Sequence, residues 1–438
     1  MAFKIGLLGY GTVGTGTAEI ILDPEGRNSL LQDIEIAKVG VRSLDQPRSP
    51  ELPSGVLTTD LAAIVSDPEI EIVVELLGGL EPARSLILQT IEHGKHVVTA
   101  NKAVIARHGA EIFTAANQAG VYVLFEAAVG GGIPVVKPLK QSLGVNRIQT
   151  VIGIINGTTN YILTQMTEEG ADFEEVLAEA QQLGYAEADP TADVDGYDAA
   201  DKIAILAAIA FNGRIKREEI DCEGIRQINA TDISYADDLG FVIKLLAIAK
   251  RGRSPIAKSN ADNDSLQVRV HPTLVSKNHP LANVNGVYNA ILVEGDPLGQ
   301  VMLFGPGAGK GATASAVVSD IVNIVGFLQT SNATRKLDPM LSCPHDHFKQ
   351  LTPIAEIDSR FYARFLCQDV PGVIGHLGTS FGKHDVSLES VVQIGFRDNL
   401  AEIVVVTHDV QEGNFRQALE EIKSLTSIDS IPSILRVL

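Results

Sequence analysis

The chain has 438 residues, of which 45% are hydrophobic and 20% charged, and this length predicts two or three globular domains. The formal net charge of −19 argues against a nucleic-acid partner and against an anionic membrane surface, because no broad basic face is expected. The three cysteines, Cys222, Cys343 and Cys367, are widely spaced, which is typical of free thiols in a reducing compartment.

The N-terminal residues enter an apolar stretch directly and carry no signal-peptide pattern. No apolar run is long enough for us to expect a span of a bilayer. We therefore expect a cytoplasmic protein with no membrane partner.

A glycine-rich turn joins an expected strand at 3–8 to an expected helix at 12–22. Gly9 permits a tight turn, Gly11 lets a pyrophosphate approach the backbone, and Gly14 lets helix and strand pack closely. The helix N-terminus adds amide donors and a favourable dipole. We expect a dinucleotide at Gly9, Gly11, Thr12, Val13 and Gly14. The alternative is a glycine-rich turn without a ligand.

The second expected strand covers 34–43 and ends near Arg42, with Arg48 close by. An enzyme that prefers NAD usually carries an acid at this point, whereas a cation suits the 2′-phosphate of NADP. We therefore expect NADP, with NAD possible. The alternative is that Arg42 is an ordinary surface arginine.

Strands expected within 69–79, 94–109 and 120–134 alternate with helices, one of them at 82–93. This alternation predicts an α/β fold with a Rossmann-type, doubly wound parallel sheet, in which ligands bind at the carboxyl ends of the strands. The residues expected at such ends are Gly78, Gly79, Asn101 and Lys102.

The regular alternation of expected strands and helices does not continue after this sheet. We expect 1–134 and 303–328 to form the dinucleotide-binding domain and 135–302 to form an α+β domain for substrate binding and oligomerisation. A linker follows at 329–357, where Cys343, His345 and His347 are interpreted as loop residues rather than metal ligands. The block 358–438 has a β-α-β-β-α-β pattern, which predicts a separate ferredoxin-like domain.

An acidic cluster lies at the start of an apolar helix. Asp193, Asp195, Asp198 and Asp201 surround Lys202, and apolar residues follow. Acids favour the N-terminal end of a helix, so one interpretation is a helix start. The other interpretation is a substrate site.

Taken in order, the motifs resemble the homoserine dehydrogenase family over about residues 3–325. They are GYGTVG, TANKA, EAAVGGGIP, GIINGTTNYIL, GYAEADPTADVDGYDAADKIAIL and GPGAGKGATASAVVSDI. The final block, with the turn DVPGVIG, resembles an ACT domain. No kinase-like region precedes the first strand, so the monofunctional form is expected. The resemblance implies NAD(P)H-dependent reduction of L-aspartate 4-semialdehyde to L-homoserine, on the route to threonine, isoleucine and methionine.

The resemblance also implies residue roles. Lys202 matches a catalytic group near the substrate oxygen, and Lys102 would polarise the carbonyl or hold a water. Glu187 and Asp198 would orient the amino acid, Asp193 and Asp195 are either their supports or loop acids, and Asp201 is structural. At the cofactor we further expect Arg42, Gly78, Lys102, Gly184 and Gly309. A sodium-like monovalent cation is implied at Glu126, Val129, Gly131 and Ile133, unless that turn holds only water.

The ACT-like turn at 369–375 predicts regulation by an amino acid, for which threonine is the natural candidate, although a degenerate module without a ligand is the alternative. We expect a homodimer or homotetramer acting on a small molecule. Two rival hypotheses are another NADP-dependent reductase on the same scaffold and a non-catalytic amino-acid sensor.

Overall fold

A computed structural model describes residues 2–50, 52–252, 265–330, 337–338, 340–343, 345–397 and 400–438. The chain forms two compact units. Unit 1 comprises Met1–Ile155, Asp201–Glu218 and Tyr288–Lys349. Unit 2 comprises Asn156–Ala200, Glu219–Val287 and Gln350–Leu438. The domain boundaries expected at 134, 302, 328 and 357 do not correspond to this division and stay predictions.

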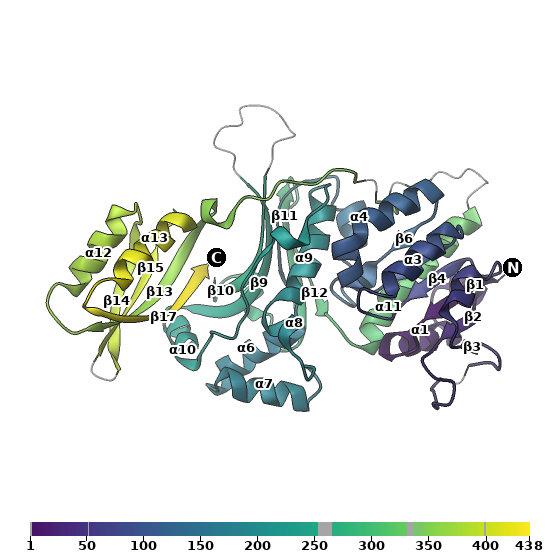
Figure 1. Cartoon of the computed structure of the whole chain (residues 1–438), viewed down its shortest axis with the longest axis horizontal. Helices are drawn as coiled ribbons and strands as arrows, with labels where there is room; N and C mark the ends of the chain where they lie inside the picture. The colour runs from purple at the N-terminus through teal and green to yellow at the C-terminus, as the bar shows by residue number, and fades with distance from the viewer. Residues whose placement is uncertain are drawn as a thin grey trace. The chain divides into compact units, whose positions relative to one another are not determined.

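The N-terminal part of unit 1 is the predicted parallel sheet, in the strand order β3-β2-β1-β4-β5-β6 (Figure 1). This order is that of a dinucleotide-binding fold. Its strands are β1 (Phe3–Leu8), β2 (Ile34–Gly40), β3 (Leu57–Thr58), β4 (Ile72–Glu75), β5 (His96–Thr99) and β6 (Val123–Leu124). Its helices are α1 (Thr12–Leu22), α2 (Leu61–Ser66), α3 (Ala83–Glu92), α4 (Lys102–Ala119) and, much later in the chain, α11 (Lys310–Thr330).

Both faces of this sheet are covered. Leu7 and Val74 belong to an apolar cluster with residues of α1 and α11. Their neighbours Leu8 and Val73 belong to a second cluster with residues of α2 and α3. Because successive strand side chains point to opposite faces, two cores form, which accounts for the uninterrupted apolar runs in the strands.

Helix α11 is long and apolar enough to cross a membrane by length and composition, which the sequence interpretation overlooked. It is instead a core helix, because Val317, Ile321 and Ile324 are fully buried in the cluster shared with α1. A Cβ added to Gly16 would approach Ala314 Cβ to 3.0 Å, so α1 and α11 pack closely.

The remainder of unit 1 contains an antiparallel set in which β11 pairs with both β7 and β12. The elements are β7 (Arg147–Ile154), β11 (Tyr288–Asp296), β12 (Gly299–Pro306), α5 (Val136–Gln141) and the larger part of α9 (Tyr197–Ala210). Helix α9 is almost wholly buried beyond its first turn, as its run of alanine, isoleucine and leucine predicts.

Unit 2 holds helices around a second group of strands. The elements before the C-terminal block are α6 (Gly157–Glu169), α7 (Phe173–Gln182), α8 (Thr191–Val194), β8 (Asp221–Cys222), α10 (Ala230–Asp238), β9 (Phe241–Arg251) and β10 (Leu266–Ser276). Strand β10 pairs antiparallel with β9 along its whole length.

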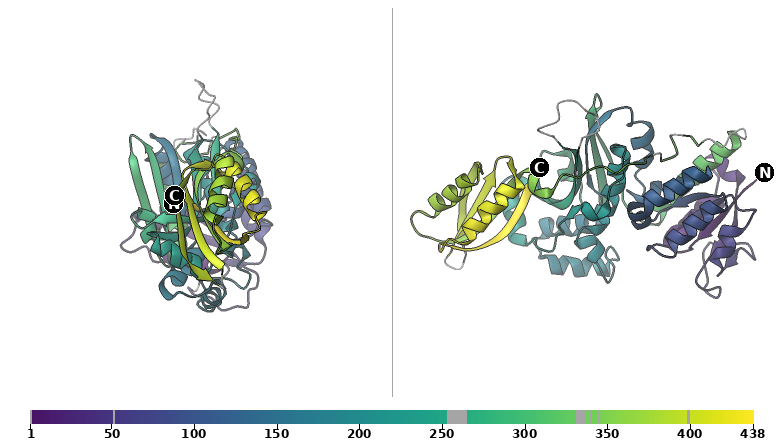
Figure 2. Two further views of the ribbon diagram at one scale, coloured as in Figure 1. Left: turned by 90° about the vertical axis from the view of Figure 1, so that its left-hand side faces the viewer. Right: turned by 45° about the horizontal axis from the view of Figure 1, so that its top comes forward.

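The C-terminal block confirms the predicted β-α-β-β-α-β pattern. It consists of β13 (Asp358–Gln368), α12 (Val373–Lys383), β14 (Leu388–Arg397), β15 (Leu400–Thr407), the short β16 (Val410–Gln411), α13 (Glu412–Lys423) and β17 (Ile428–Val437). Helices α12 and α13 lie side by side against this sheet (Figure 2), and Phe381 and Phe415 fill the core between.

The sheet of this block continues into the preceding one, and the separate domain expected here stays a prediction. Strand β17 pairs in parallel with β10, through Thr273 with Arg436 and Leu274 with Val437. The last residues of the chain thus connect the C-terminal block to the strands of unit 2. Such a long-range pairing has no local sequence signal.

Candidate active site

The glycine turn of unit 1 has the geometry that a dinucleotide requires. Gly9 has a φ of 110°, and an added Cβ would lie 2.9 Å from Leu76 O. A Cβ on Gly14 would lie 2.3 Å from Gly9 O, so both positions require glycine for the fold itself. A Cβ on Gly11 would meet nothing within 4 Å. Gly11 therefore faces open space, at the place where a phosphate would approach.

Helix α1 begins at Thr12, as predicted, and Gly11 supplies no side-chain cap to its first amides. The first amides of a helix lack partners within the helix and form a natural site for an anion. The amides of Thr12 and Val13 lie in this first turn, so these residues fit the phosphates of a dinucleotide.

The other predicted cofactor residues are spread over both units. In unit 1, Arg42 is exposed, two residues beyond the end of β2. Gly78 and Gly309 both have positive φ and open space at Cβ, so a ligand can approach either backbone. Gly184 belongs to unit 2, after α7, with a φ of 76°.

A buried polar network lies at the carboxyl ends of β4 and β5. Glu75 is fully buried; its Oε2 accepts a 2.6 Å hydrogen bond from Thr99 Oγ1, and its Oε1 accepts one of 2.8 Å from Leu77 N. Asn101 N donates to Thr99 Oγ1 at 2.9 Å. Sequence reasoning missed Glu75 and Thr99, although a glutamate inside the run EIVVELL was a usable signal.

The same network sets the start of α4. Asn101 Oδ1 accepts from Val104 N at 3.2 Å and so caps the helix, while its Nδ2 donates to Gly79 O at 2.7 Å. Lys102 is the first residue of this helix and is half-buried. The capping therefore positions Lys102 at the strand end, where parallel sheets bind their ligands.

Lys202 occupies a defined position on α9. Its Nζ donates a 2.7 Å hydrogen bond to the backbone oxygen of Ile155, the residue after the end of β7. The side chain is half-buried. Asp198 lies four residues earlier, so the two side chains emerge from the same face of the helix.

Asn156 organises the acidic cluster of unit 2, a role that the sequence interpretation did not assign. Its Nδ2 donates to Asp193 Oδ1 at 2.6 Å and to Asp198 Oδ2 at 2.9 Å. Its Oδ1 accepts from Thr159 N at 2.9 Å and caps α6. The motif GIINGTTN contained this residue, and an asparagine before a helix start is a known capping signal.

The other acids of the cluster have other partners. Asp195 Oδ1 pairs with Arg226 Nε at 2.5 Å. Asp201 is buried and pairs with Arg217 Nε at 2.7 Å, with Arg107 Nη2 at 3.5 Å. These ion pairs hold both carboxylates in place.

Glu187 follows α7 in unit 2, and its side chain is exposed. Gln181 Nε2 donates to the backbone oxygen of Glu187 at 3.0 Å, so the loop is held while the carboxylate stays accessible. An exposed carboxylate on a braced loop is suited to bind an ammonium group.

The turn predicted to hold a cation is buried in unit 1. The carboxylate of Glu126 accepts from the amides of Val135, Val136 and Lys137 at 2.7–2.9 Å, so it holds the start of α5. The four expected ligands would therefore offer backbone oxygens. In the part of the chain that the structure describes, the carbonyls of Val129, Gly131 and Ile133 accept no hydrogen bond. Buried carbonyl oxygens without partners fit a hard cation.

No group of three or more histidine, cysteine or acidic side chains suited to a metal occurs among the described residues. This finding covers Cys343, His345 and His347, which were interpreted as loop residues.

The comparisons with known proteins cover the whole chain. Residues 9–126 match the NAD-binding domain of homoserine dehydrogenase, 134–322 match homoserine dehydrogenase, and 361–426 match the ACT domain. A homoserine dehydrogenase of Synechocystis sp. is 68% identical over 438 residues, which is 100% of both chains. One of Pseudomonas aeruginosa is 42% identical, over 97% of this chain and 96% of that protein.

Solved structures agree. A homoserine dehydrogenase from Thiobacillus denitrificans superposes with a TM-score of 0.90 at 40% identity, over 100% of this chain and 98% of that one. A hyperthermophilic archaeal homoserine dehydrogenase in complex with NADPH has a TM-score of 0.61 at 27% identity, over 76% of this chain and 100% of that one. The chain belongs to the homoserine dehydrogenase family of oxidoreductases, with an NAD-binding domain, a catalytic domain and a C-terminal ACT domain.

Proposed function

We propose that this enzyme catalyses the reversible, NADPH-dependent reduction of L-aspartate 4-semialdehyde to L-homoserine, a step toward threonine, isoleucine and methionine. The observation that carries the proposal is the arrangement around Asn156. One amide holds the carboxylates of Asp193 and Asp198, and Lys202 follows one helical turn after Asp198. An amino acid with an aldehyde needs carboxylates for its ammonium and a cation for its reacting oxygen.

The proposed roles follow from charge and placement. Asp198 and Glu187 bind the α-ammonium group of the substrate, and Asp193 supports Asp198 through the shared amide of Asn156. Lys202 donates a hydrogen bond to the aldehyde oxygen and delivers the proton that this oxygen gains on reduction. Lys102 provides a second cation that polarises the carbonyl or holds a water beside it. When bound, the nicotinamide supplies the hydride.

The residues that would hold the dinucleotide are the glycine turn and the strand ends of unit 1. Gly9, Gly11 and Gly14, with the amides of Thr12 and Val13, would receive the pyrophosphate, and Gly78 and Gly309 would border the rest. Gly184, in unit 2, is proposed as a further cofactor residue. The exposed Arg42 favours NADP over NAD, because a guanidinium pairs well with a 2′-phosphate. The archaeal relative in complex with NADPH supports this preference.

A monovalent cation such as Na⁺ is proposed at the backbone oxygens of Glu126, Val129, Gly131 and Ile133. The support is that the carbonyls of Val129, Gly131 and Ile133 accept no hydrogen bond among the described residues, whereas Glu126 O accepts one from Val129 N at 3.4 Å. Such an ion would brace the turn that precedes α5 and would not take part in the chemistry.

The ACT domain is proposed to bind threonine, the end product of the route, and to inhibit the enzyme. The turn at 369–375 supports this role, because Gly372 has a φ of 97° and directly precedes α12, while Val370 and Ile374 are exposed beside it. A turn with free helix amides and exposed apolar side chains suits an amino acid.

We further propose a cytoplasmic homo-oligomer, either a dimer or a tetramer. Its support is an exposed apolar patch on β11 and the edge strand β12. Tyr288 and Phe304 stack with ring centroids 5.2 Å apart and are 46% and 54% exposed. Exposed aromatic pairs on an edge strand are typical of protein interfaces.

The test is a steady-state assay at 340 nm with L-homoserine and either NADP or NAD, with and without threonine. Turnover that is faster with NADP and suppressed by threonine supports the reaction, the cofactor preference and the effector together. Turnover that added threonine does not change contradicts only the proposal that threonine is the effector. Absence of turnover in folded protein that binds the dinucleotide contradicts the reaction and favours a different reductase, which a panel of hydroxy acids would identify.

A further inference from the structure

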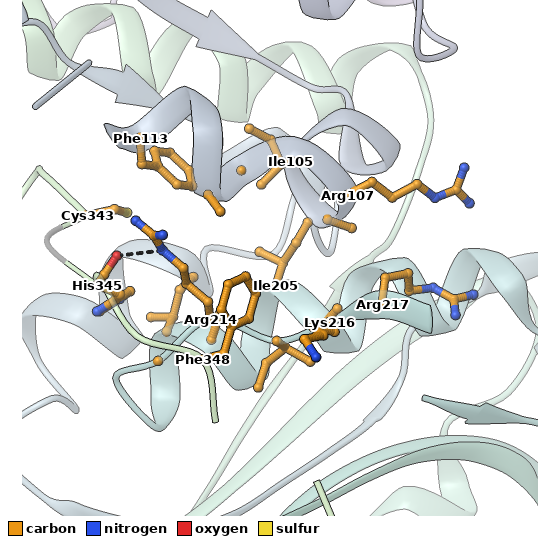
Figure 3. Close-up of a pocket in the computed structure, with 18 of the residues that line it drawn as sticks. Ile105, Arg107, Phe113, Ile205, Arg214, Lys216, Arg217, Cys343, His345 and Phe348 are labelled. Atoms are coloured by element: carbon orange, nitrogen blue, oxygen red, sulfur yellow. Dashed lines mark hydrogen bonds between the residues drawn. The ribbon is translucent and has the colours of Figure 1, made fainter. Parts of the chain in front are cut away.

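A cavity of about 200 Å³ lies within unit 1, between helices α4 and α9 (Figure 3). Ile105 and Phe113 of α4 and Ile205 of α9 form its apolar wall. The segment Gly213–Glu218 and the residues Cys343, His345 and Phe348 close it. None of these residues belongs to the glycine turn or to the Asn156 cluster, so the cavity is distinct from the site described above.

The cavity contains the guanidinium of Arg214, whose hydrogen bonds go to neutral groups and which feels the charge of the exposed Asp346 without forming an ion pair with it. Arg214 Nε donates to the backbone oxygen of His345 at 2.9 Å, and its Nη2 donates to Thr114 Oγ1 at 2.9 Å. Its Cζ lies 6.0 Å from the ring centroid of Phe348. These partners are all neutral, and Arg214 makes no ion pair with any described carboxylate. A half-buried cation without a paired anion favours the binding of one.

Further cations lie around the cavity. Arg107 and Arg217 both pair with Asp201, and Lys216 Nζ lies 6.0 Å from the ring centroid of Phe348. Glu218 is the one acid among the described lining residues, and its side chain is exposed. In Figure 3 Arg107 and Arg217 lie at one end of the cavity, while Arg214 and His345 lie at the other.

His345 offers a second polar group. Its Nε2 is buried and has no hydrogen-bond partner in the described part of the chain. Burial, followed by the positive charge of Lys140, lowers the pKa of His345 to about 4. The ring is therefore neutral at pH 7, and Arg214 supplies the charge at this end while His345 supplies a hydrogen bond.

We propose that this cavity binds a small organic anion with an apolar body, whose carboxylate pairs with Arg214 and whose apolar part lies between Ile105 and Ile205. An apolar cavity of roughly 150 Å³ holds a molecule the size of benzene, so the space suits a phenyl group with a short acid chain and excludes a dinucleotide. Helix α4 begins at Lys102 and helix α9 carries Lys202. The anion thus contacts both lysine-bearing helices of the family's catalytic apparatus.

The test measures binding directly, without reference to catalysis. Isothermal titration of the full-length protein uses 3-phenylpropanoate and its neutral counterpart 3-phenylpropan-1-ol. We expect one acid per chain, with a Kd at least tenfold lower than that of the alcohol. Arg214→Gln should raise the Kd for the acid at least tenfold and leave the alcohol unchanged. Ala110→Leu, which fills the cavity from α4, should abolish binding of both.

Arg147→Gln is the matched control, because Arg147 is an exposed cation of unit 1 that does not line the cavity. It should bind the acid as the wild type does. Equal affinity for acid and alcohol, unchanged binding by Arg214→Gln, or displacement of the acid by NADP would each overturn the proposal. If Arg214→Gln does not fold, the acid–alcohol comparison and Ala110→Leu decide the question.

Discussion

Lys202 donates a 2.7 Å hydrogen bond from Nζ to the backbone oxygen of Ile155. This contact ties α9 to the residue directly before Asn156, whose side chain holds Asp193 and Asp198. The lysine and the carboxylates are thus fixed by neighbouring residues of one segment. An ammonium group has three donors, so the bond to Ile155 O leaves Lys202 able to donate to a substrate oxygen as well.

Lys202→Met should lower kcat by about 100- to 10,000-fold, the range expected for loss of a positioned proton donor. The KM for homoserine should change much less, because the carboxylates that bind the ammonium remain. Lys277→Met removes a cation of unit 2 that is 45% exposed and serves as the control. Near-normal turnover of a folded Lys202→Met enzyme would refute the catalytic assignment.

Asn156 caps α6 and also donates hydrogen bonds to Asp193 and Asp198. The variant Asn156→Ser tests these two roles separately. Serine is also a good N-cap, so α6 should survive and the Tm should change little. The shared amide donor is lost, and the repulsion between Asp193 and Asp198 should raise the KM for homoserine about tenfold, since removing such a donor costs about 1–3 kcal/mol.

The control for this variant is Asn229→Ser, because Asn229 caps α10 by accepting from Asp232 N at 3.0 Å. It should leave the KM unchanged. An Asn156→Ser enzyme with the wild-type KM would show that the two carboxylates do not need a common donor.

Arg42→Ser should raise the KM for NADPH about tenfold and leave the KM for NADH unchanged, because only the phosphate of NADPH needs the guanidinium. Arg48 donates to the backbone oxygens of Ser43 and Gln46, so it braces the loop. Arg48→Ser should therefore affect both coenzymes alike. Equal changes for both coenzymes in Arg42→Ser would contradict the NADP preference.

Arg364→Met should destabilise unit 2 by about 3–5 kcal/mol, because it leaves two buried acids without the cation that neutralises them. Arg364 is fully buried; its Nε donates to Asp232 Oδ1 at 3.0 Å and its Nη1 to Glu402 Oε1 at 2.6 Å. This cluster connects β13 and β15 of the ACT domain to α10. The Tm should fall clearly, as followed by circular dichroism.

Arg360→Met is the matched control on the same strand. Arg360 pairs with Glu389 near the surface, where an ion pair contributes at most about 1 kcal/mol. If both variants lowered the Tm by the same amount, the buried cluster would contribute no more to stability than the surface ion pair.

Local signals explain which parts of the fold the sequence predicted. The strand Phe3–Leu8 and the helix Thr12–Leu22 were predicted correctly, because glycine spacing and apolar runs act over a few residues. The second strand ends at Gly40 rather than at 43, because the apolar pattern continues into the loop after the ladder has ended. The pairing of β10 with β17 joins segments more than 150 residues apart, and no local sequence pattern predicts it.

The residues of the candidate site also differ in whether a local sequence signal points to them. Lys202 and Asp198 could be singled out because they stand at the start of an apolar stretch, where charges need partners, and because their motif resembles the family's; their roles stay predictions. Asn156 and Glu75 were missed, because their importance lies in hydrogen bonds that form only when distant segments meet. Arg214 was missed for a related reason, since a surface arginine and a half-buried one look alike in a sequence.

The final prediction concerns acid stability and His96 on β5. The ring accepts a 2.9 Å hydrogen bond from Tyr122 N at Nδ1 and stacks on the Tyr122 ring, with centroids 5.4 Å apart. Burial lowers the pKa of His96 to about 4 from a model-peptide value of 6.5. The unfolded chain therefore binds a proton between pH 6.5 and 4 that the folded chain does not bind. Stability is highest above pH 6.5 and is lost as the pH falls through this window, by about 3 kcal/mol in total.

His96→Asn removes this titration. The Tm of the wild type should exceed that of His96→Asn at pH 7.5, and the difference should shrink steadily as the pH falls to 4.5 at constant ionic strength. The same substitution at His408, which is exposed, should give a curve parallel to the wild type. A Tm difference between wild type and His96→Asn that did not change with pH would mean that His96 has the same pKa in the folded and the unfolded chain, and would contradict the prediction.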